Sequence, residues 1–247
     1  VTGPTGSGKT TTLYSTLKAL ATSEVNVCTI EDPIEMVEPS FNQMQVRQNI
    51  DLSFADGVKS MLRQDPDIIM IGEIRDLETA EMAVQAALTG HLVLSTLHTN
   101  DAPSSVTRLL DLGVPHYLVT ATVLGIMAQR LVRTLCPHCK EEVEVDKEAW
   151  HELTHPFRMK VPAKVCQPVG CLECRNTGYK GRMGVYETMP LDSELKGLIH
   201  DQVDLETLTR AAVKQGMKPL RISGALKVAR GLTTIEEVLR VTPVQDV

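Results

Sequence analysis

The first part of the chain alternates short apolar runs with longer segments of helical periodicity. The runs at 25–30, 68–71 and 92–95 are short and rich in aliphatic residues, which predicts buried strands. Strands that alternate with helices in this way predict a parallel sheet covered on both faces, and therefore an α/β fold. The expected helices cover residues 8–21, 53–64 (with Ser53 as N-cap) and 77–88.

The pattern changes twice after the third predicted strand. Residues 103–130 keep a helical periodicity, whereas 131–182 combine cysteines, prolines and glycine pairs with few periodic runs. Helical periodicity returns from Ser193, and Thr234 with Glu237 predicts a capping box at the start of a further helix. We therefore expect three parts, which are a core over 1–130, a small loop-rich module over 131–190 and a helical subdomain over 191–247.

Composition narrows the class of protein. The 247 residues are 43% hydrophobic and 23% charged, as in ordinary globular proteins. A formal net charge of −6 argues against a broad positively charged surface that binds nucleic acid. No apolar run reaches the roughly 18 residues of a membrane-spanning helix, and no signal peptide is visible, so nothing suggests export.

A glycine-rich loop that predicts phosphate binding occupies residues 3–10. Its glycines let backbone N–H groups turn inward around phosphate oxygens, and the helix that follows adds positive potential at its N-terminus. Lys9 is expected to reach the β- and γ-phosphates of a nucleotide, and Thr10 to supply an oxygen to Mg²⁺. The ordinary alternative is a glycine turn that starts a helix. The predicted nucleotide-binding residues here are Gly3, Pro4, Thr5, Gly6, Ser7, Gly8, Lys9, Thr10 and Thr11.

Such a loop normally follows a buried strand. Val1 and Thr2 precede it here, and the chain does not begin with Met. We expect these two residues to be the end of that strand, and the chain to be the C-terminal part of a longer protein.

Acidic residues follow two of the predicted strands. Glu73 comes after the run 68–71, and Glu31, Asp32 and Glu35 come after the run 25–30. Because ligands of open α/β sheets bind beyond the carboxyl ends of the strands, both groups are expected to face the phosphate loop. Glu73, Glu31 and Glu35 are catalytic candidates, and Asp32 a nucleotide-binding one. The alternative is an acidic loop that only ends a strand.

Two histidines flank the third predicted strand. His91 precedes the run 92–95 and His98 follows it. A lone histidine is more often structural, but two at the ends of one strand suggest contact with the γ-phosphate or a substrate. We assign His98 to the catalytic candidates and His91 to the nucleotide-binding ones.

Four of the six cysteines form two Cys-x-x-Cys pairs. Four thiolates complete a tetrahedral Zn²⁺ site with no open position, so the predicted role is structural. Free core thiols and a redox pair are the alternatives. Cys166 is a weaker candidate ligand, and Cys28 is expected to be a small core residue. The predicted zinc ligands are Cys136, Cys139, Cys171 and Cys174.

At this point the motifs closely resemble one family, the secretion ATPases that drive type II secretion and the assembly of type IV pili. The loop at 3–10 looks like the family's Walker A motif, and 31–35 looks like its acidic "Asp box". Residues 63–76 look like its atypical Walker B motif with Glu73, and 89–100 look like its His box. The resemblance covers essentially the whole chain. It implies a RecA-like P-loop fold, a homo-hexamer, and Mg-ATP hydrolysis coupled to motion.

The resemblance also implies a setting. Members of the family are cytoplasmic, lie at the bacterial inner membrane, and act on a platform protein and other assembly proteins. The matching position makes Arg182 a further nucleotide-binding candidate. The tetracysteine is typical of assembly-type members rather than retraction motors, which favours secretion or pilus extension. One departure is Lys59, where the family usually carries arginine; lysine keeps the charge but loses the planar fork of a guanidinium.

Two other functions stay open at the level of sequence. A hexameric RecA-type nucleic-acid translocase would share the loop and the fold, although the acidic balance and the tetracysteine argue against it. An inactive nucleotide-binding assembly subunit would share the fold, although the intact loop and Glu73 argue against that reading. We expect ATP, Mg²⁺ and a structural Zn²⁺ as ligands, and no nucleic acid.

Overall fold

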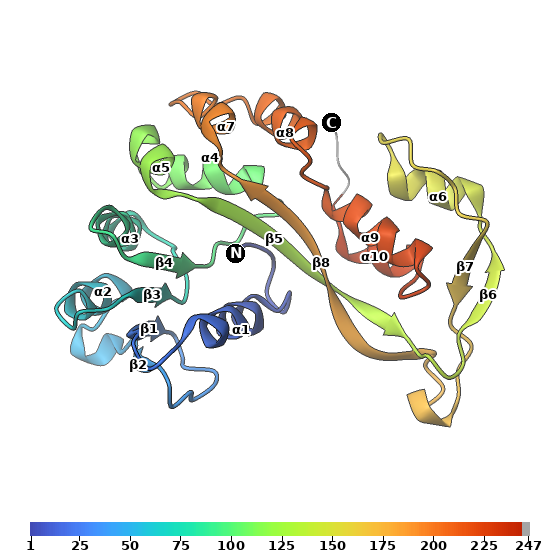
Figure 1. Ribbon diagram of the computed structural model, residues 1–247, viewed down its shortest axis with the longest axis horizontal. Helices are drawn as coiled ribbons and strands as arrows, with labels where there is room; N and C mark the ends of the chain where they lie inside the picture. Colours follow the sequence, from blue (N-terminus) through green and yellow to red (C-terminus); the bar gives the residue numbers. More distant parts are fainter. Residues whose placement is uncertain (244–247) are drawn as a thin grey trace.

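The computed structural model describes residues 1–243, and its first part is a four-stranded parallel sheet with the order β2-β1-β3-β4 (Figure 1). Strands β1 (Val27–Glu31), β3 (Ile68–Ile71) and β4 (Leu92–Ser95) confirm the three predicted strands. A fourth strand, β2 (Asn42–Gln45), pairs with β1 at the outer edge and carries polar residues that the apolar pattern could not reveal.

Helices cover both faces of this sheet. Side chains of β3 alternate, so that Ile69 and Ile71 pack with Val58 of α2 on one face. Ile68 and Met70 face Leu17 of α1 on the other. Ser53 and Asp56 form a capping box at α2, and Asp76 accepts a hydrogen bond from the N–H of Thr79 to cap α3. The helices of this layer are α1 (Lys9–Leu20), α2 (Phe54–Met61) and α3 (Leu77–Leu88), with a 3-10 turn η1 (Gln48–Ile50) before α2.

The helix expected through residue 130 is wrong beyond Thr122. Two short helices, α4 (Pro103–Asp111) and α5 (His116–Thr122), are followed by the strand β5 (Gly125–Leu135). Ile126, Ala128, Arg130 and Val132 are buried at every second position, which is the period of a strand.

A long antiparallel ribbon results from the pairing of β5 with β8 (Tyr179–Pro190). Figure 1 shows this ribbon crossing the molecule from the parallel sheet to the cysteine-rich end. The expected boundary at residue 130 lies inside β5, and the one at residue 190 lies at the end of β8. The ribbon therefore runs without a break from the core into the loop-rich module.

The first two residues connect the sheet to the ribbon. Thr2 forms parallel bridges with Leu97, beyond β4, and with Ala128 on β5. Its N–H donates to the carbonyl of Met127 at 2.8 Å, and its own carbonyl accepts from the N–H of Gln129 at 2.9 Å. These bonds hold the start of the phosphate loop between β4 and β5.

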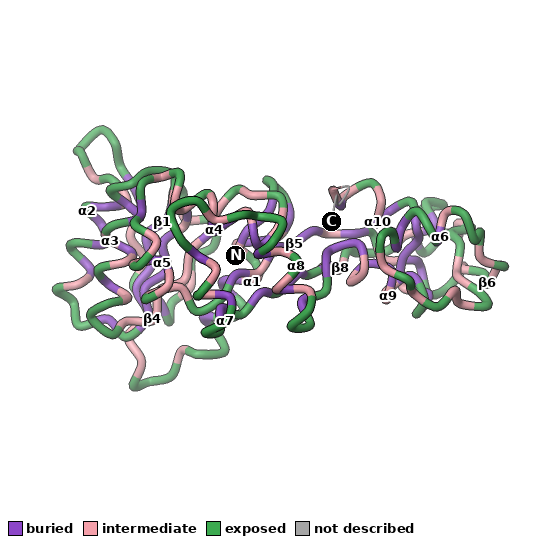
Figure 2. The backbone as a smooth tube through the Cα atoms, turned by 90° about the horizontal axis from the view of Figure 1, so that it is seen from above, coloured by how far each residue is buried: buried purple, intermediate pink, exposed green. Residues whose placement is uncertain are grey.

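The remaining elements pack along the ribbon and beyond it. Trp150 and Leu153 of α6 join Leu220 and Val238 of the C-terminal helices in one buried cluster with the inner face of β8. Figure 2 shows an elongated molecule with β6 at the end remote from the sheet. These elements are β6 (Glu141–Glu144), α6 (Lys147–Thr154), β7 (Lys164–Gln167), η2 (Leu172–Cys174), α7 (Ser193–Gly197), α8 (Leu205–Lys214), α9 (Leu220–Ala229) and α10 (Ile235–Val241).

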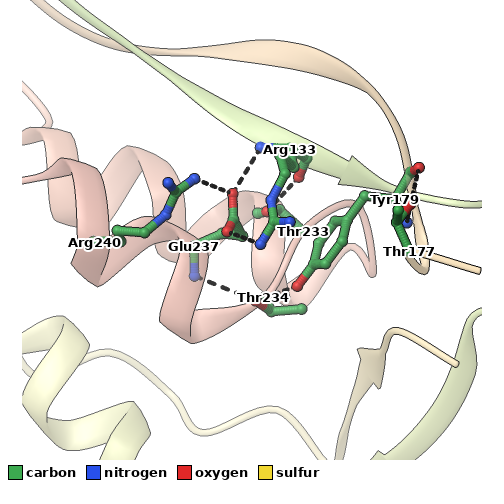
Figure 3. A network of polar contacts seen from close by, with 7 residues as sticks. All are labelled: Arg133, Thr177, Tyr179, Thr233, Thr234, Glu237 and Arg240. Carbon is green, nitrogen blue, oxygen red and sulfur yellow. Dashed lines mark hydrogen bonds and ion pairs between the residues drawn. The ribbon is translucent and has the colours of Figure 1, made fainter.

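A polar network fastens α10 to the ribbon (Figure 3). Thr234 caps α10 as predicted, because its hydroxyl accepts from the N–H of Glu237. The buried Glu237 carboxylate turns away from the cap and accepts from the Arg133 guanidinium at 2.5 Å, the Arg133 N–H at 3.0 Å and Arg240 at 2.8 Å. The Arg133 guanidinium also lies over the ring of Tyr179, 4.0 Å from its centroid.

Replacement of Glu237 by Gln is expected to destabilise the fold at neutral pH and not at low pH. Burial opposes the charge of Glu237, but the hydrogen bonds from Arg133 and Arg240 outweigh it and lower the pKa from 4.5 to about 2. A depressed carboxyl pKa stabilises the fold above about pH 4.5, and this contribution is lost as the pH falls toward 2. We expect a loss of about 2–3 kcal/mol at pH 7.

Urea unfolding at pH 7, 5 and 3 measures this difference. The gap between wild type and Glu237→Gln should narrow steadily below pH 4.5. Glu236→Gln is the matched control, because Glu236 is the adjacent, exposed carboxylate and should change stability little at any pH. A gap that stays constant with pH would contradict the assigned role of the charge.

Candidate nucleotide site

The loop at 3–10 leads directly into α1, as the sequence predicted. Gly8 is the N-cap of α1 with φ 86°, and Gly3 has φ 146°, so both lie in the region that favours glycine. The Lys9 ammonium donates to the carbonyls of Gly3 at 2.8 Å and Pro4 at 3.2 Å. The loop is thus closed around its own lysine. Burial lowers the pKa of Lys9, although the negative charge of Glu73 acts in the opposite direction.

A pocket of about 490 Å³ opens over this loop. It collects side chains from the loop, from the ends of β1 and β3, from the segment after β4, and from the ribbon. The candidate residues that line it are Thr5, Gly6, Gly8, Lys9, Thr10, Thr11, Glu31, Asp32, Glu35, Glu73, His98 and Arg182. The fold therefore brings Thr5 and Arg182 to the same pocket, although more than 170 residues separate them in the sequence.

Glu73 lies just beyond the end of β3 and is only 9% exposed. One carboxylate oxygen accepts from Arg75 at 2.6 Å, and the other lies 3.3 Å from Nε2 of His98. The segment is fixed by the N–H of Ile74, which donates to the carbonyl of Thr96 at 3.0 Å. A carboxylate held on both oxygens and facing a phosphate loop has the position that a group orienting a water molecule requires.

The three acids after β1 have different environments. Glu31 is only 3% exposed, and its oxygens accept from Tyr14 at 2.7 Å, Thr29 at 2.6 Å and Gln43 at 3.2 Å. Burial and then Glu31 raise the pKa of Tyr14 well above its ordinary value, so the phenol stays a donor. Glu31 is therefore fixed by its neighbours.

Glu35 is exposed and accepts from the hydroxyl of Thr10 at 3.3 Å. Asp32 is also exposed and lines the pocket beside it. Of the three acids, Glu35 thus has the direct contact with the residue predicted to bind Mg²⁺.

The candidate His91, and Lys59 of the departure from the family pattern, both lie apart from this arrangement. His91 precedes β4, at the end of the strand opposite to His98, and lines a separate apolar cavity. Its Nδ1 lies 2.9 Å from the carbonyl of Ala86 and 3.0 Å from the hydroxyl of Thr89. Lys59 is an exposed residue of α2.

Two residues of the ribbon were missed by the sequence analysis. Gln129 on β5 contacts the phosphate loop through its side chain, and its backbone N–H donates to Thr2, just before the loop. Arg130 points to the other face and donates to the carbonyls of Asn100 at 2.7 Å and Val241 at 3.0 Å. The signal that could have revealed both residues is the alternation typical of a strand over 126–132. The apolar residues of this segment fit a helical pattern equally well, and that pattern hides the alternation.

The donors around the loop fit a phosphate chain. Among residues 1–243, the buried side-chain polar atoms without a hydrogen-bond partner are Oγ of Ser7 and Nε1 of Trp150. The first of these lies within the loop, two residues before Lys9. An unpartnered buried hydroxyl in a glycine-rich loop is a group that a phosphate oxygen would satisfy.

The cysteine pairs come together at the far end of the ribbon. Cys136 follows β5, and η2 places Cys171 and Cys174 just before β8. The four sulfur atoms all lie within 4.8 Å of one another, with Sγ–Sγ distances of 3.9 Å for Cys136–Cys171 and 3.8 Å for both Cys139–Cys174 and Cys171–Cys174. A tetrahedron of Zn–S bonds requires about 3.8 Å between sulfurs, so the set fits zinc.

Backbone groups add to this fit. N–H groups of Cys171 and Gly178 each donate to Sγ of Cys174 at 3.2 Å, and Gly170 donates to Sγ of Cys139 at 3.3 Å. Burial opposes ionisation of Cys174, but the N–H groups of Cys171 and Gly178 outweigh it and lower its pKa, whereas burial raises the pKa of Cys139. Cys166 lies on β7 and Cys28 on β1, both outside the cluster.

Comparison with known proteins identifies the family to which this sequence is similar. A family model described as "Type II/IV secretion system protein" matches residues 1–240. The type IV pilus assembly ATPase TfpB of Acinetobacter baylyi is 65% identical over 98% of this chain and 42% of its own length. The type II secretion system ATPase E of Vibrio cholerae is 49% identical over 98% of this chain and 48% of its own. The chain therefore spans less than half the length of these relatives.

Solved structures agree with the fold. A crystal structure of the pilus retraction motor PilT with bound ADP has a TM-score of 0.71 and 29% identity, over 98% of this chain and 60% of that one. The ATPase DotB of Legionella pneumophila has a TM-score of 0.69 and 27% identity, over 97% and 58%. The predicted α/β fold with a clustered tetracysteine is thereby confirmed.

Proposed function

The chain belongs to the type II/IV secretion system protein family, and we propose that it is the ATP-hydrolysing part of a motor for type II secretion or type IV pilus assembly. The observation that carries the proposal is the single pocket in which the phosphate loop meets Glu73, Glu35, His98 and Arg182. These residues come from five separate segments, and together they supply the groups that ATP hydrolysis needs.

Each group has a distinct part in the proposed reaction. The loop amides and Lys9 bind the phosphates, and Thr10 with Glu35 would hold Mg²⁺, which would neutralise phosphate charge. Glu73 accepts a hydrogen bond from the attacking water, and Arg75 and His98 keep its carboxylate in place. Glu31 positions the acidic segment, because it is buried and accepts hydrogen bonds from Tyr14, Thr29 and Gln43. Arg182 and His98 stabilise charge on the transferred phosphate.

The wider setting belongs to the same proposal. We infer a homo-hexamer that acts on a platform protein at the cytoplasmic face of the inner membrane, in line with the named functions of the relatives. No helix within residues 1–243 has the length and apolar character needed to cross a bilayer. A zinc ion held by the tetracysteine favours secretion or pilus extension. The nucleic-acid translocase gains no support from the comparisons reported above.

The test of nucleotide binding is the replacement of Lys9 by Ala. We expect at least a tenfold loss of ATP and ADP affinity, because the variant removes the cation that contacts the phosphates. Isothermal calorimetry with each nucleotide and Mg²⁺ measures it. Lys18→Ala is the matched control, since Lys18 is an exposed lysine of the same helix that pairs with Glu38 instead. Unchanged affinity in Lys9→Ala would sink the proposed site.

A further inference from the structure

Gln129 is a buried polar residue on β5 whose side-chain amide contacts both the phosphate loop and the helix α1 that follows it. It is only 2% exposed. Its Nε2 donates to the carbonyl of Ser7 at 2.7 Å, and its Oε1 accepts from the hydroxyl of Thr12 at 2.7 Å. One amide therefore joins the crest of the loop to the first turn of α1.

We propose that Gln129 is a positioning residue that sets the phosphate loop in its binding conformation. In a trans peptide unit the C=O and the following N–H point in opposite directions. When the Ser7 carbonyl is held on Gln129, the N–H of Gly8 is directed away from β5, and Gly8 lines the pocket. The bond to Gln129 thus aims a loop donor at the nucleotide while Gln129 itself stays behind the loop.

The space around Gln129 supports this role. A Cβ atom at Gly3 would lie 2.5 Å from the carbonyl oxygen of Gln129, and one at Gly8 would lie 2.8 Å from its Nε2. The backbone N–H of Gln129 also donates to the carbonyl of Thr2 at 2.9 Å. Five residues of the loop and its flanks are therefore packed against or hydrogen-bonded to Gln129, and the two glycines are needed partly because Gln129 fills the space beside them.

An amide is the side chain that this position requires. It offers a donor to Ser7 and an acceptor to Thr12 at the same time. Glutamate of the same shape would offer acceptors only, would face the Ser7 carbonyl with a negative charge, and would place that charge behind a loop that attracts anions. Leucine has a similar size and offers neither group, so it leaves the Ser7 carbonyl and the Thr12 hydroxyl without this partner.

The inference rests on the proposed function, and calorimetry with ADP tests it. We expect Gln129→Leu to weaken ADP binding about tenfold and Gln129→Glu about a hundredfold. Pyrophosphate, which has no base or sugar to contact other parts of the pocket, should lose affinity by a similar factor. Val132→Ala is the matched control, because Val132 is buried on the opposite face of β5. It should lower the melting temperature and leave ADP affinity within about twofold.

A second measurement reads the loop without any ligand. Hydrogen exchange of the amides at residues 5–8 should be at least about tenfold faster in Gln129→Leu than in wild type or Val132→Ala. Equal exchange in the loop, or an equal loss of ADP affinity in Val132→Ala, would overturn the positioning role. A wild-type chain that binds no nucleotide would instead sink the proposed function, and the exchange rates would still decide the role of Gln129.

Discussion

Replacement of Glu73 by Gln is expected to reduce ATP hydrolysis by about 100-fold or more while MgATP affinity changes little. Glutamine keeps the size of the side chain and an oxygen that can still accept from Arg75, so the pocket retains its shape. It cannot take a proton from water or polarise it as a carboxylate does. Phosphate release at saturating ATP and calorimetric affinity, measured on the same preparation, separate the two effects.

The control for this variant lies nearby in the sequence, at the start of the next helix. Glu78 is an exposed carboxylate in the first turn of α3, and Glu78→Gln carries the same change of charge outside the pocket. It should hydrolyse ATP at the wild-type rate. Normal turnover in Glu73→Gln would refute the assigned role, and a loss of MgATP affinity equal to the loss of rate would show that the carboxylate serves binding instead.

Loss of the tetracysteine metal is expected to have the second large effect. Metal analysis should find one zinc per chain, and Cys139→Ser or Cys171→Ser should reduce it to near zero. Structural zinc in small domains supplies on the order of 10 kcal/mol of binding free energy at neutral pH, so its loss should disorder the knuckles around the four cysteines. Limited proteolysis should then cut within residues 136–140 and 168–178.

The rest of the molecule should survive this loss. Trp150 and Leu153 anchor α6 in the core that includes α9, independently of the sulfur atoms. Nucleotide affinity should therefore fall little, and the melting transition of the parallel sheet should persist. Cys166→Ser is the control, since Cys166 lies outside the cluster and should leave the zinc content at one. A zinc content far from one per chain in wild type would refute the site.

That the candidate residues would meet in one pocket could be predicted, because their meeting depends on local chemistry and one general rule. Glu73 and the acids after β1 each follow a strand of the same parallel sheet, and carboxyl ends of parallel strands share an edge. The glycine loop follows Thr2, which bridges to Leu97 just beyond the end of β4. That rule does not say which carboxylate accepts hydrogen bonds from neighbouring side chains. Glu31 and Glu35 look equivalent in sequence, and only the contacts with Tyr14 and Thr10 distinguish them.

The ribbon could not be predicted, for a different reason. Residues 116–132 are apolar enough to satisfy a helical period as well as an alternating one. What selects the strand is pairing with β8, which begins more than forty residues after β5 ends. The polar strand β2 could not be predicted for a similar reason. Its backbone pairs with β1, but its side chains do not show the apolar pattern of a buried strand. Gln129 was missed because its strand was missed.

The geometry of the ribbon also has a mechanical consequence. Gln129 rests against the phosphate loop, and Leu135 on the same strand immediately precedes the first zinc-ligand candidate, Cys136. At a rise near 3.3 Å per residue these two points are about 20 Å apart, so a tilt of roughly 10° at the loop carries the cysteine end through about 3 Å. If the paired strands tilt as one body, they would act as a lever arm with the loop near its fulcrum and the cysteine module at its tip.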